Sequence, residues 1–191
     1  MHESLYQYFL TKTNLSPSEF AQISEHFKYK KVKRGHILLA EGEVCHHLYF
    51  VLKGCLRFFA TGEDGKENTR YFAFEQKFGT ALTSFIENKI SFENIQSIEA
   101  SELLVIDRDN FYRLVETNKY INLIYRGILE MAYVTSQRRI YGLQGDTALD
   151  RLKWLLEYQP SIMIRLPHKI IASYLGVTPY TLSRLKASLY N

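Results

Sequence analysis

The feature that most restricts the fold of this 191-residue chain is a series of short apolar segments separated by glycine turns. Turn signals occur at Arg34-Gly35, Glu41-Gly42 and Lys53-Gly54, and the segment Gly62–Gly65 is typical of a hairpin turn. Between them we predict seven strands, at Tyr29–Val32, Ile37–Ala40, Leu48–Leu52, Leu56–Ala60, Asn68–Phe74, Glu93–Ile98 and Leu103–Ile106. Evenly spaced short strands with glycine turns indicate an antiparallel sandwich or β-roll.

Helical patterns flank the strands on both sides. We predict helices at Leu5–Lys12, Pro17–Phe27, Asn110–Glu116, Lys119–Leu143 and from Asp146 to about Tyr158. Ser16 and Glu19 have the spacing of a capping box, and Asp109 and Asp146 are suitable N-caps for two of the later helices. The predicted fold class is therefore α+β, with an N-terminal antiparallel β-roll, a long helix and a C-terminal helical domain.

The long helix carries a regular apolar pattern. Ile121, Ile124, Ile128 and Met131 recur at spacings of three and four residues. Two apolar heptads on a helix of this length indicate a seam for self-association. Burial against the β-domain would produce the same pattern. We expect a dimerisation helix with these four residues in its seam.

The segment HKIIASYLGVTPYTLSRLKA, residues 168–187, has the pattern of a helix-turn-helix. Ala172 is small enough to let two helices approach closely, and Gly176 can adopt the left-handed conformation that a sharp turn needs. Thr178 is a suitable cap for the second helix, and Pro179 suits its first position. The apolar positions of the pattern are filled by Ile171, Leu175, Val177, Leu182 and Leu185.

The excess of positive charge lies in the same part of the chain. The sequence has 24 Lys and Arg against 20 Asp and Glu, and no acidic residue follows Glu157. The net charge of +4 is therefore carried after Glu157, by Arg165, Lys169, Arg184 and Lys186. A neutral body with a basic end indicates an anionic partner for that end.

The second helix of such a motif enters the major groove of DNA with its N-terminal part facing the base edges. Arg184 is the best candidate for a bidentate contact to guanine, although it could also serve only as a phosphate contact. Lys169, at the start of the first helix, suits a phosphate contact. The predicted DNA-binding residues are Lys169, Thr178, Tyr180, Thr181, Ser183, Arg184 and Lys186.

The order of these parts resembles the CRP/FNR family of bacterial transcription regulators. Arg34–Phe59 looks like the first part of a cyclic nucleotide-binding domain, and Leu166–Lys186 is similar to the DNA-binding signature of the family, particularly its small Bacteroidetes-type members. We expect a sensor domain over residues 1–117, a dimerisation helix over 118–144 and a helix-turn-helix domain over 145–191. The resemblance implies a homodimer that binds double-stranded DNA and contacts RNA polymerase.

One departure from the family concerns the effector. Members that bind cAMP carry a Gly-Glu pair and, some ten residues later, an Arg-Ser pair, which hold the ribose hydroxyl and the cyclic phosphate. Here Thr80 follows Gly79, and Ile90-Ser91 stands where Arg-Ser is expected. The candidate effector pocket comprises Gly79, Thr80, Ala81, Lys89 and Ser91. We expect its ligand, whose identity is unknown, not to be cAMP.

Two other functions are open at this stage. A ligand-sensing module that binds no DNA would share the β-roll, but it has no need of a helix-turn-helix. A cupin-type enzyme would need metal-binding histidines one residue apart, whereas His46 and His47 are adjacent and would point to opposite faces of a strand. We therefore expect neither catalysis nor a metal or other cofactor.

The N-terminal segment and the two cysteines indicate the cellular compartment of the protein. The segment MHESLYQYFLTKTN lacks the basic start and apolar run of a secretory signal, and no apolar stretch approaches the length of a membrane span. Cys45 and Cys55 fit a reducing compartment. We expect a cytoplasmic protein.

Overall fold

The computed structural model describes residues 2–189 of the chain. These residues divide into two compact units. The first unit comprises Met1–Phe58 and Phe72–Met131, and the second comprises Phe59–Tyr71 and Ala132–Asn191. The second unit thus combines the C-terminal helices with a hairpin tip from the middle of the β-region. No helix among the described residues is both long enough and apolar enough to cross a membrane.

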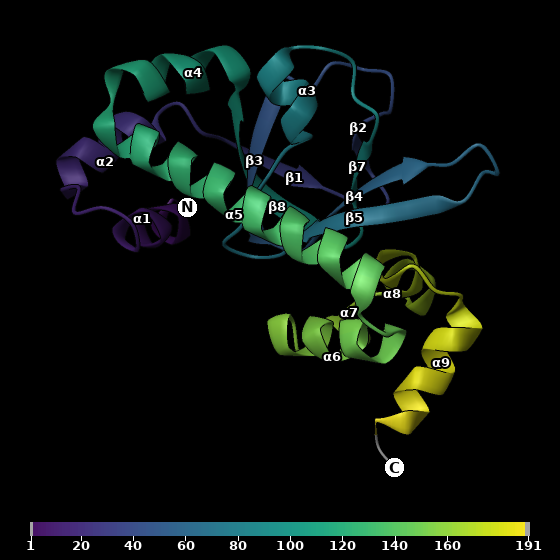
Figure 1. The fold of residues 1–191 in the computed structure, drawn as a ribbon. Coiled ribbons are helices and arrows are strands. Elements are labelled where there is room, and N and C mark those ends of the chain that lie inside the picture. Colours follow the sequence, from purple (N-terminus) through teal and green to yellow (C-terminus); the bar gives the residue numbers. More distant parts are fainter. Residues whose placement is uncertain (1, 190–191) are drawn as a thin grey trace. The chain divides into compact units, whose positions relative to one another are not determined.

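Within residues 2–189, eight short strands form the β-region, which Figure 1 shows together with the helices. They are β1 (Lys28–Val32), β2 (Ile37–Leu39), β3 (His47–Lys53), β4 (Leu56–Thr61), β5 (Glu67–Ala73), β6 (Phe78–Gly79), β7 (Asn94–Ser97) and β8 (Ser101–Asp107). They form two four-stranded sheets with the orders β1-β8-β3-β6 and β2-β7-β4-β5. The pairings of β1 and β3 with β8, of β3 with β6 and of β2 with β7 are antiparallel. The predicted α+β class with an antiparallel β-roll is confirmed.

The turn at Gly54 shows why glycine is required between strands. Its φ of +96° lies in the region that side chains disfavour. An added Cβ would also lie 2.9 Å from the carbonyl oxygen of Ala100 and 2.3 Å from the hydroxyl oxygen of Ser101. Gly35 and Gly42 also have positive φ, at +85° and +88°. The glycines that separate the predicted strands therefore do mark turns.

Four short helices belong to the first unit. They are α1 (Glu3–Leu10), α2 (Pro17–Ser24), α3 (Leu82–Glu87) and α4 (Arg108–Thr117). The predicted capping box of α2 is present, since the backbone N–H of Ser16 donates to a Glu19 carboxylate oxygen at 2.7 Å and the N–H of Glu19 donates back to the Ser16 hydroxyl. The predicted N-cap Asp109 is corrected to Asp107, whose carboxylate accepts from the N–H of Asn110 at 2.9 Å.

Helix α5 (Lys119–Gly145) corresponds to the predicted long helix. Two of the residues assigned to its seam, Ile121 and Ile124, are 0% and 1% exposed within a single chain. They belong to the apolar core of the chain, which fits burial as the explanation of the pattern, and the role of these residues in dimerisation stays a prediction. Ile128 and Met131 are half-buried. In the first turns of α5, the regular spacing of apolar residues thus reflects burial within the chain.

The second unit contains the remaining helices, α6 (Ala148–Tyr158), α7 (Ile162–Arg165), α8 (His168–Leu175) and α9 (Pro179–Ser188). Asp146 was expected to cap α6, but Thr147 does so. The Thr147 hydroxyl accepts from the N–H of Asp150 at 3.2 Å, and the carboxylate of Asp150 accepts from the N–H of Thr147 at 3.3 Å. This capping box begins the helix one residue later than Asp146 would allow.

Candidate nucleic-acid interface

Helices α8 and α9 form the predicted helix-turn-helix pair (Figure 1). The side chains that face the core of the pair are buried, namely Ile171, Ala172, Tyr174, Leu175 and Leu182. Gly176 ends α8 with a φ of +69°, and the N–H of Val177 donates to the carbonyl of Ala172 at 3.0 Å. The left-handed glycine lets the chain reverse within the few residues between the helices.

The N-terminus of α9 is built as the sequence predicts. Thr178 is the N-cap, and its hydroxyl accepts from the N–H of Thr181 at 3.1 Å, while Pro179 occupies the first turn. The hydroxyls of Thr178 and Thr181 also bond to each other, and the Ser183 hydroxyl donates to the carbonyl of Pro179 at 3.1 Å. These three hydroxyls therefore already have partners inside the helix, and each keeps capacity for a further hydrogen bond.

Two larger side chains project from the same helix. Tyr180 is 72% exposed, and the guanidinium of Arg184 lies 6.0 Å from the centre of its ring, one turn further along. Arg184 is itself exposed, and Lys186 is half-buried. A guanidinium at this distance from an aromatic ring is weakly attracted to it, which favours one orientation of Arg184 over the others.

Lys169 lies in the first turn of α8 and is exposed, as is His168 beside it. Neither α8 nor α9 contains an acidic residue. The structure thus places the predicted DNA-binding residues on one helix and on the start of its neighbour, in a surface without negative charge. Their contact with DNA stays a prediction.

The sequence analysis did not single out Arg139 and Arg151, which donate to backbone carbonyls at the end of α8. An arginine in an ordinary helical pattern gives no signal of such a role. Burial lowers the pKa of Arg139 from its ordinary value, and the nearby Tyr174 counteracts part of that effect. Burial also raises the pKa of the Tyr174 phenol.

The candidate effector residues lie in the first unit, on β6, in the segment between β6 and α3 and in the segment that follows α3. Gly79 is tightly packed, because an added Cβ would lie 2.7 Å from a ring carbon of Phe58. The hydroxyl of Thr80 donates to the carbonyl of His47 at 2.9 Å and lies 3.2 Å from the sulfur of Cys45. The Ser91 hydroxyl donates to the carbonyl of Glu93 at 2.8 Å. The buried hydroxyls here thus bond to the protein itself.

Lys89 provides the only positive charge between Gly79 and Ser91. Its side chain is 74% exposed, and its ammonium lies 3.2 Å from a carboxylate oxygen of Glu87. The C-terminal end of α3 is held instead by Arg108, whose Nε and Nη2 donate to the carbonyls of Phe85 and Ile86 at 2.6 and 3.1 Å. The structure brings the five candidate pocket residues close in the fold but turns the single cation toward solvent.

A surface hollow of about 520 Å³ lies beside this region, at the connection between β2 and β3. It is lined by Leu38, Leu39, Glu43, Val44, Cys45, His46, His47 and Tyr49. Burial, followed by the charges of Lys30 and His46, holds the pKa of His47 below its ordinary value, so that its imidazole is neutral at pH 7. Among the described residues, no three His, Cys, Asp or Glu side chains are grouped so that they could hold a metal ion.

Comparison with known proteins shows where this architecture belongs. Residues 29–118 match the family model of the cyclic nucleotide-binding domain. FixK2 from Bradyrhizobium japonicum superposes with a TM-score of 0.76 at 16% identity, covering 86% of this chain and 84% of that one. A CRP/FNR-family regulator from Eubacterium rectale gives a TM-score of 0.69 at 21% identity, covering 90% and 82%. This chain has the fold of the CRP/FNR-type regulators.

A third structure with the CRP/FNR-type fold is CLP from Xanthomonas campestris, a global regulator responsive to c-di-GMP. Its TM-score is 0.72 at 16% identity, and the match covers 92% of each chain. No curated protein sequence matches this chain. The predicted resemblance to CRP/FNR-type regulators is confirmed by these structures and by the domain match.

The later part of α5 exposes several large apolar side chains. Here α5 exposes Tyr133, Val134, Ile140, Tyr141 and Leu143, of which Val134 is 64% and Tyr141 is 63% exposed. Leu123, earlier in the helix, is 37% exposed. This apolar face is not the one that carries Ile121 and Ile124.

Proposed function

We propose that this protein is a dimeric, sequence-specific DNA-binding transcription regulator whose β-roll responds to an effector other than cAMP. The observation that carries the proposal is the capped α8–α9 pair. Its packing residues are buried, and Arg184, Lys169 and Tyr180 are exposed on a surface free of acidic side chains. An N-terminal part of the recognition helix that presents an arginine and an aromatic ring suits the major groove.

The apolar outer face of α5 supports the dimer. Leu123, Val134 and Tyr141 lie on one face of the helix, with Gly127, Glu130 and Gln137 between them at alternating spacings of four and three residues. That spacing is the heptad of a two-helix seam, and exposed large apolar side chains in such a row require a partner. A second copy of the chain would cover this exposed row. The two recognition helices of such a dimer would read half-sites about one turn of DNA apart.

The first unit supports the choice of effector. A cyclic phosphate that leaves water needs a fixed cation and several donors in its place. The hydroxyls of Thr80 and Ser91 are bonded to the chain's own carbonyls, and Lys89 faces solvent. We infer that the ligand of the β-roll carries no buried anionic group at this position. We also propose that the protein acts in the cytoplasm and contacts RNA polymerase.

The test of DNA binding is selection from a pool of random duplexes, because the operator is not known. The full-length protein should enrich an inverted repeat whose half-sites lie about 10–10.5 base pairs apart, since a two-fold dimer reads two successive turns of one DNA face. The Arg184→Ala variant is the matched control and should lose preference at one position of each half-site. Enrichment of no sequence would favour a ligand-sensing module without DNA binding.

A further inference from the structure

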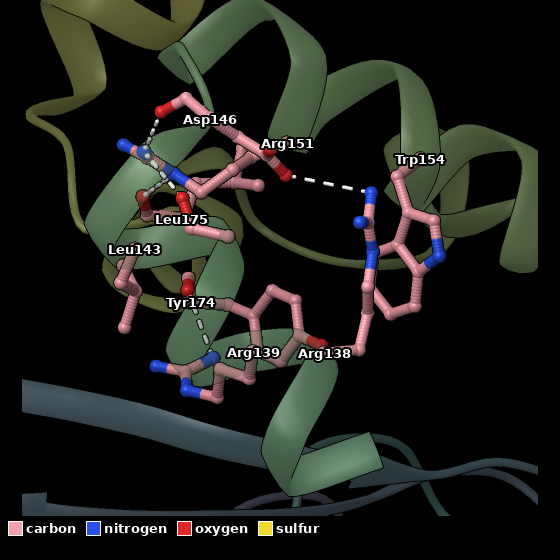
Figure 2. Close-up of a pocket in the computed structure, with 9 residues that line it drawn as sticks. Arg138, Arg139, Leu143, Asp146, Arg151, Trp154, Tyr174 and Leu175 are labelled. Carbon is pink, nitrogen blue, oxygen red and sulfur yellow. Dashed lines mark hydrogen bonds and ion pairs between the residues drawn. The ribbon is translucent and has the colours of Figure 1, made fainter. Parts of the chain in front are cut away.

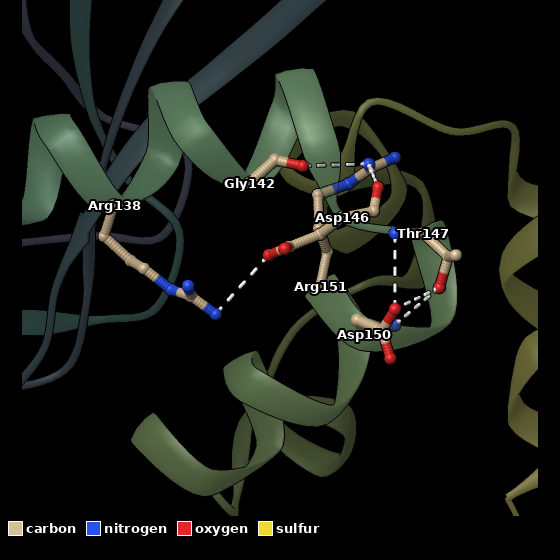
Figure 3. A network of polar contacts seen from close by, with 6 residues as sticks. All are labelled: Arg138, Gly142, Asp146, Thr147, Asp150 and Arg151. Carbon is tan, nitrogen blue, oxygen red and sulfur yellow. Dashed lines mark hydrogen bonds and ion pairs between the residues drawn. The ribbon is translucent and has the colours of Figure 1, made fainter.

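The carboxyl ends of two helices meet at one arginine. Nη1 of Arg151 donates to the carbonyl of Asp146 at 2.8 Å and to that of Gly142 at 3.3 Å, both at the end of α5 (Figure 3). Its Nε donates to the carbonyl of Leu175, the last residue of α8, at 3.0 Å. The last carbonyls of a helix lack intrahelical partners and carry partial negative charge. One guanidinium therefore neutralises both helix ends and holds them together.

A second arginine holds the neighbouring carbonyl. Nη1 of Arg139 donates to the carbonyl of Tyr174 at 3.0 Å, and its guanidinium lies 4.7 Å from the centre of the Tyr174 ring (Figure 2). Nη2 of Arg139 donates to the carbonyl of Thr69, in the hairpin part of the second unit, at 2.8 Å. The hydroxyls of Thr69 and Ser173 are hydrogen-bonded to each other. The end of α8 is thus held from α5, from α6 and from the hairpin.

The carbonyls of Tyr174 and Leu175 lie directly before the turn of the helix-turn-helix motif. Tyr174 and Leu175 are the last two residues of α8, directly before the left-handed Gly176. The turn also lies against α5, because a Cβ added at Gly176 would be 3.3 Å from Leu143. Only Val177 and Thr178 separate this turn from α9. A small rotation of the final peptide groups of α8 would therefore change the direction in which the recognition helix leaves the turn.

We propose that Arg139 and Arg151 are positioning residues for DNA readout, which clasp the carboxyl end of α8 and so fix the direction of α9. This inference rests on the proposed function for its consequence in DNA binding. Neither arginine lies on α8 or α9, and neither is required to touch the DNA. Their effect is exerted through the geometry of the turn, so it appears in sequence selectivity rather than in general attraction to DNA.

Arg138 provides a matched control. It precedes Arg139 in α5 and carries the same charge, but its Nη2 pairs with the carboxylate of Asp146 at 3.4 Å, and its guanidinium lies 5.9 Å from the centre of the Trp154 ring. Among the described residues it donates to no carbonyl of α8. Replacing Arg138 with Gln therefore removes one positive charge from the same region and the ion pair with Asp146, but it leaves the donors to Tyr174 and Leu175 in place.

The first experiment measures the clasp without DNA. Hydrogen–deuterium exchange is followed at the amides of Gly176–Leu182 in full-length wild type and in the Arg138→Gln, Arg139→Gln and Arg151→Gln variants. Loss of bonds to a charged donor should speed exchange at the turn about tenfold or more for Arg139→Gln and Arg151→Gln. Arg138→Gln should match the wild type. Equal exchange in all four proteins would overturn the proposal, whether or not the wild type selects a DNA sequence.

The second experiment measures selectivity by titrating each protein with a selected duplex and with a scrambled duplex over a range of salt concentrations. Arg139→Gln and Arg151→Gln should reduce the ratio of the two affinities about tenfold, and the salt slope should not change because no phosphate contact is lost. Arg151→Lys should recover part of the ratio, and it replaces Arg151→Gln if that variant does not fold. An equal loss for both duplexes would mean that the arginines only stabilise the fold, which would overturn the positioning role.

Discussion

On α9, side chains that look equally polar in the sequence differ in what they can offer to DNA. The hydroxyls of Thr178, Thr181 and Ser183 are hydrogen-bonded within the helix. Arg184 is exposed, and its guanidinium lies 6.0 Å from the centre of the Tyr180 ring. A planar fork of donors that is already oriented loses less freedom when it binds two acceptors of a guanine. Arg184 is therefore the residue expected to carry most base selectivity.

We predict that Arg184→Ala weakens binding to a selected duplex by about 1–3 kcal/mol and relaxes preference at one position of each half-site. Lys169→Ala should weaken binding to all duplexes alike and lower the salt slope by about one, because it removes a single phosphate contact. Fluorescence anisotropy at several salt concentrations measures both. Unchanged sequence preference in Arg184→Ala would reduce Arg184 to a phosphate contact.

At the scale of elements, α5 carries apolar side chains in two environments. Ile121 and Ile124 are buried in the core of their own chain. Val134 and Tyr141 are exposed, and Glu130, which lies in the same heptad row, pairs with Arg126 at 3.4 Å. We propose this exposed row as the surface for a second copy of the protein.

We predict that the double variant Val134→Glu with Tyr141→Glu is monomeric, whereas the wild type is a dimer. Four uncompensated charges would enter the two-fold seam, and each buried unpaired charge costs several kcal/mol. Light scattering distinguishes the two states. Ser136→Glu, an exposed position of the same helix outside the heptad row, serves as the control and should remain dimeric. A dimer that persists in the double variant would contradict the proposed seam.

The elements also show what sequence patterns can and cannot predict. All seven predicted strands are present, because strong turn residues such as Gly54 separate them. The two-residue β6 and the short helices α3 and α7 were missed, since elements of that length have no detectable period. The two N-cap predictions were wrong because Thr147 directly follows Asp146 and Asp107 lies two residues before Asp109, so each place offers two plausible caps. The apolar spacing of α5 shows that a face is buried but not which molecule buries it.

At the scale of the whole molecule, the chain has the fold of a cyclic nucleotide-binding domain, and its candidate effector pocket lies in the segment Gly79–Ser91. The segment from Gly79 to Ser91 keeps the tight packing of Gly79 against Phe58. Its buried hydroxyls are satisfied by the protein, and the one cation, Lys89, pairs with Glu87 at the surface. The fold of a cyclic nucleotide-binding domain is therefore present, and the segment Gly79–Ser91 holds a single cation that faces solvent.

We predict that cAMP and cGMP do not bind in the micromolar range. The missing glutamate and arginine contacts would each contribute roughly 1.5–3 kcal/mol, so their joint loss lowers affinity at least about a hundredfold. Lys89 does not replace the arginine, because an ammonium lacks the planar fork that matches two phosphate oxygens. Isothermal titration of the full-length protein measures this, with a known cAMP-binding protein as the control. Micromolar binding to the wild type would contradict this interpretation of the segment Gly79–Ser91.

The hairpin tip, residues 59–71, belongs to the same compact unit as the segment that begins at Ala132, although sixty residues of chain separate them. A C-terminal fragment cut at Ala132 would therefore discard part of its own unit. In that fragment Arg139 would lose the carbonyl of Thr69 as an acceptor, and Ser173 would lose the Thr69 hydroxyl. Dissection of this protein into separately expressed pieces therefore has to follow the spatial unit rather than the linear order, for instance by grafting the hairpin onto the C-terminal segment through a short linker.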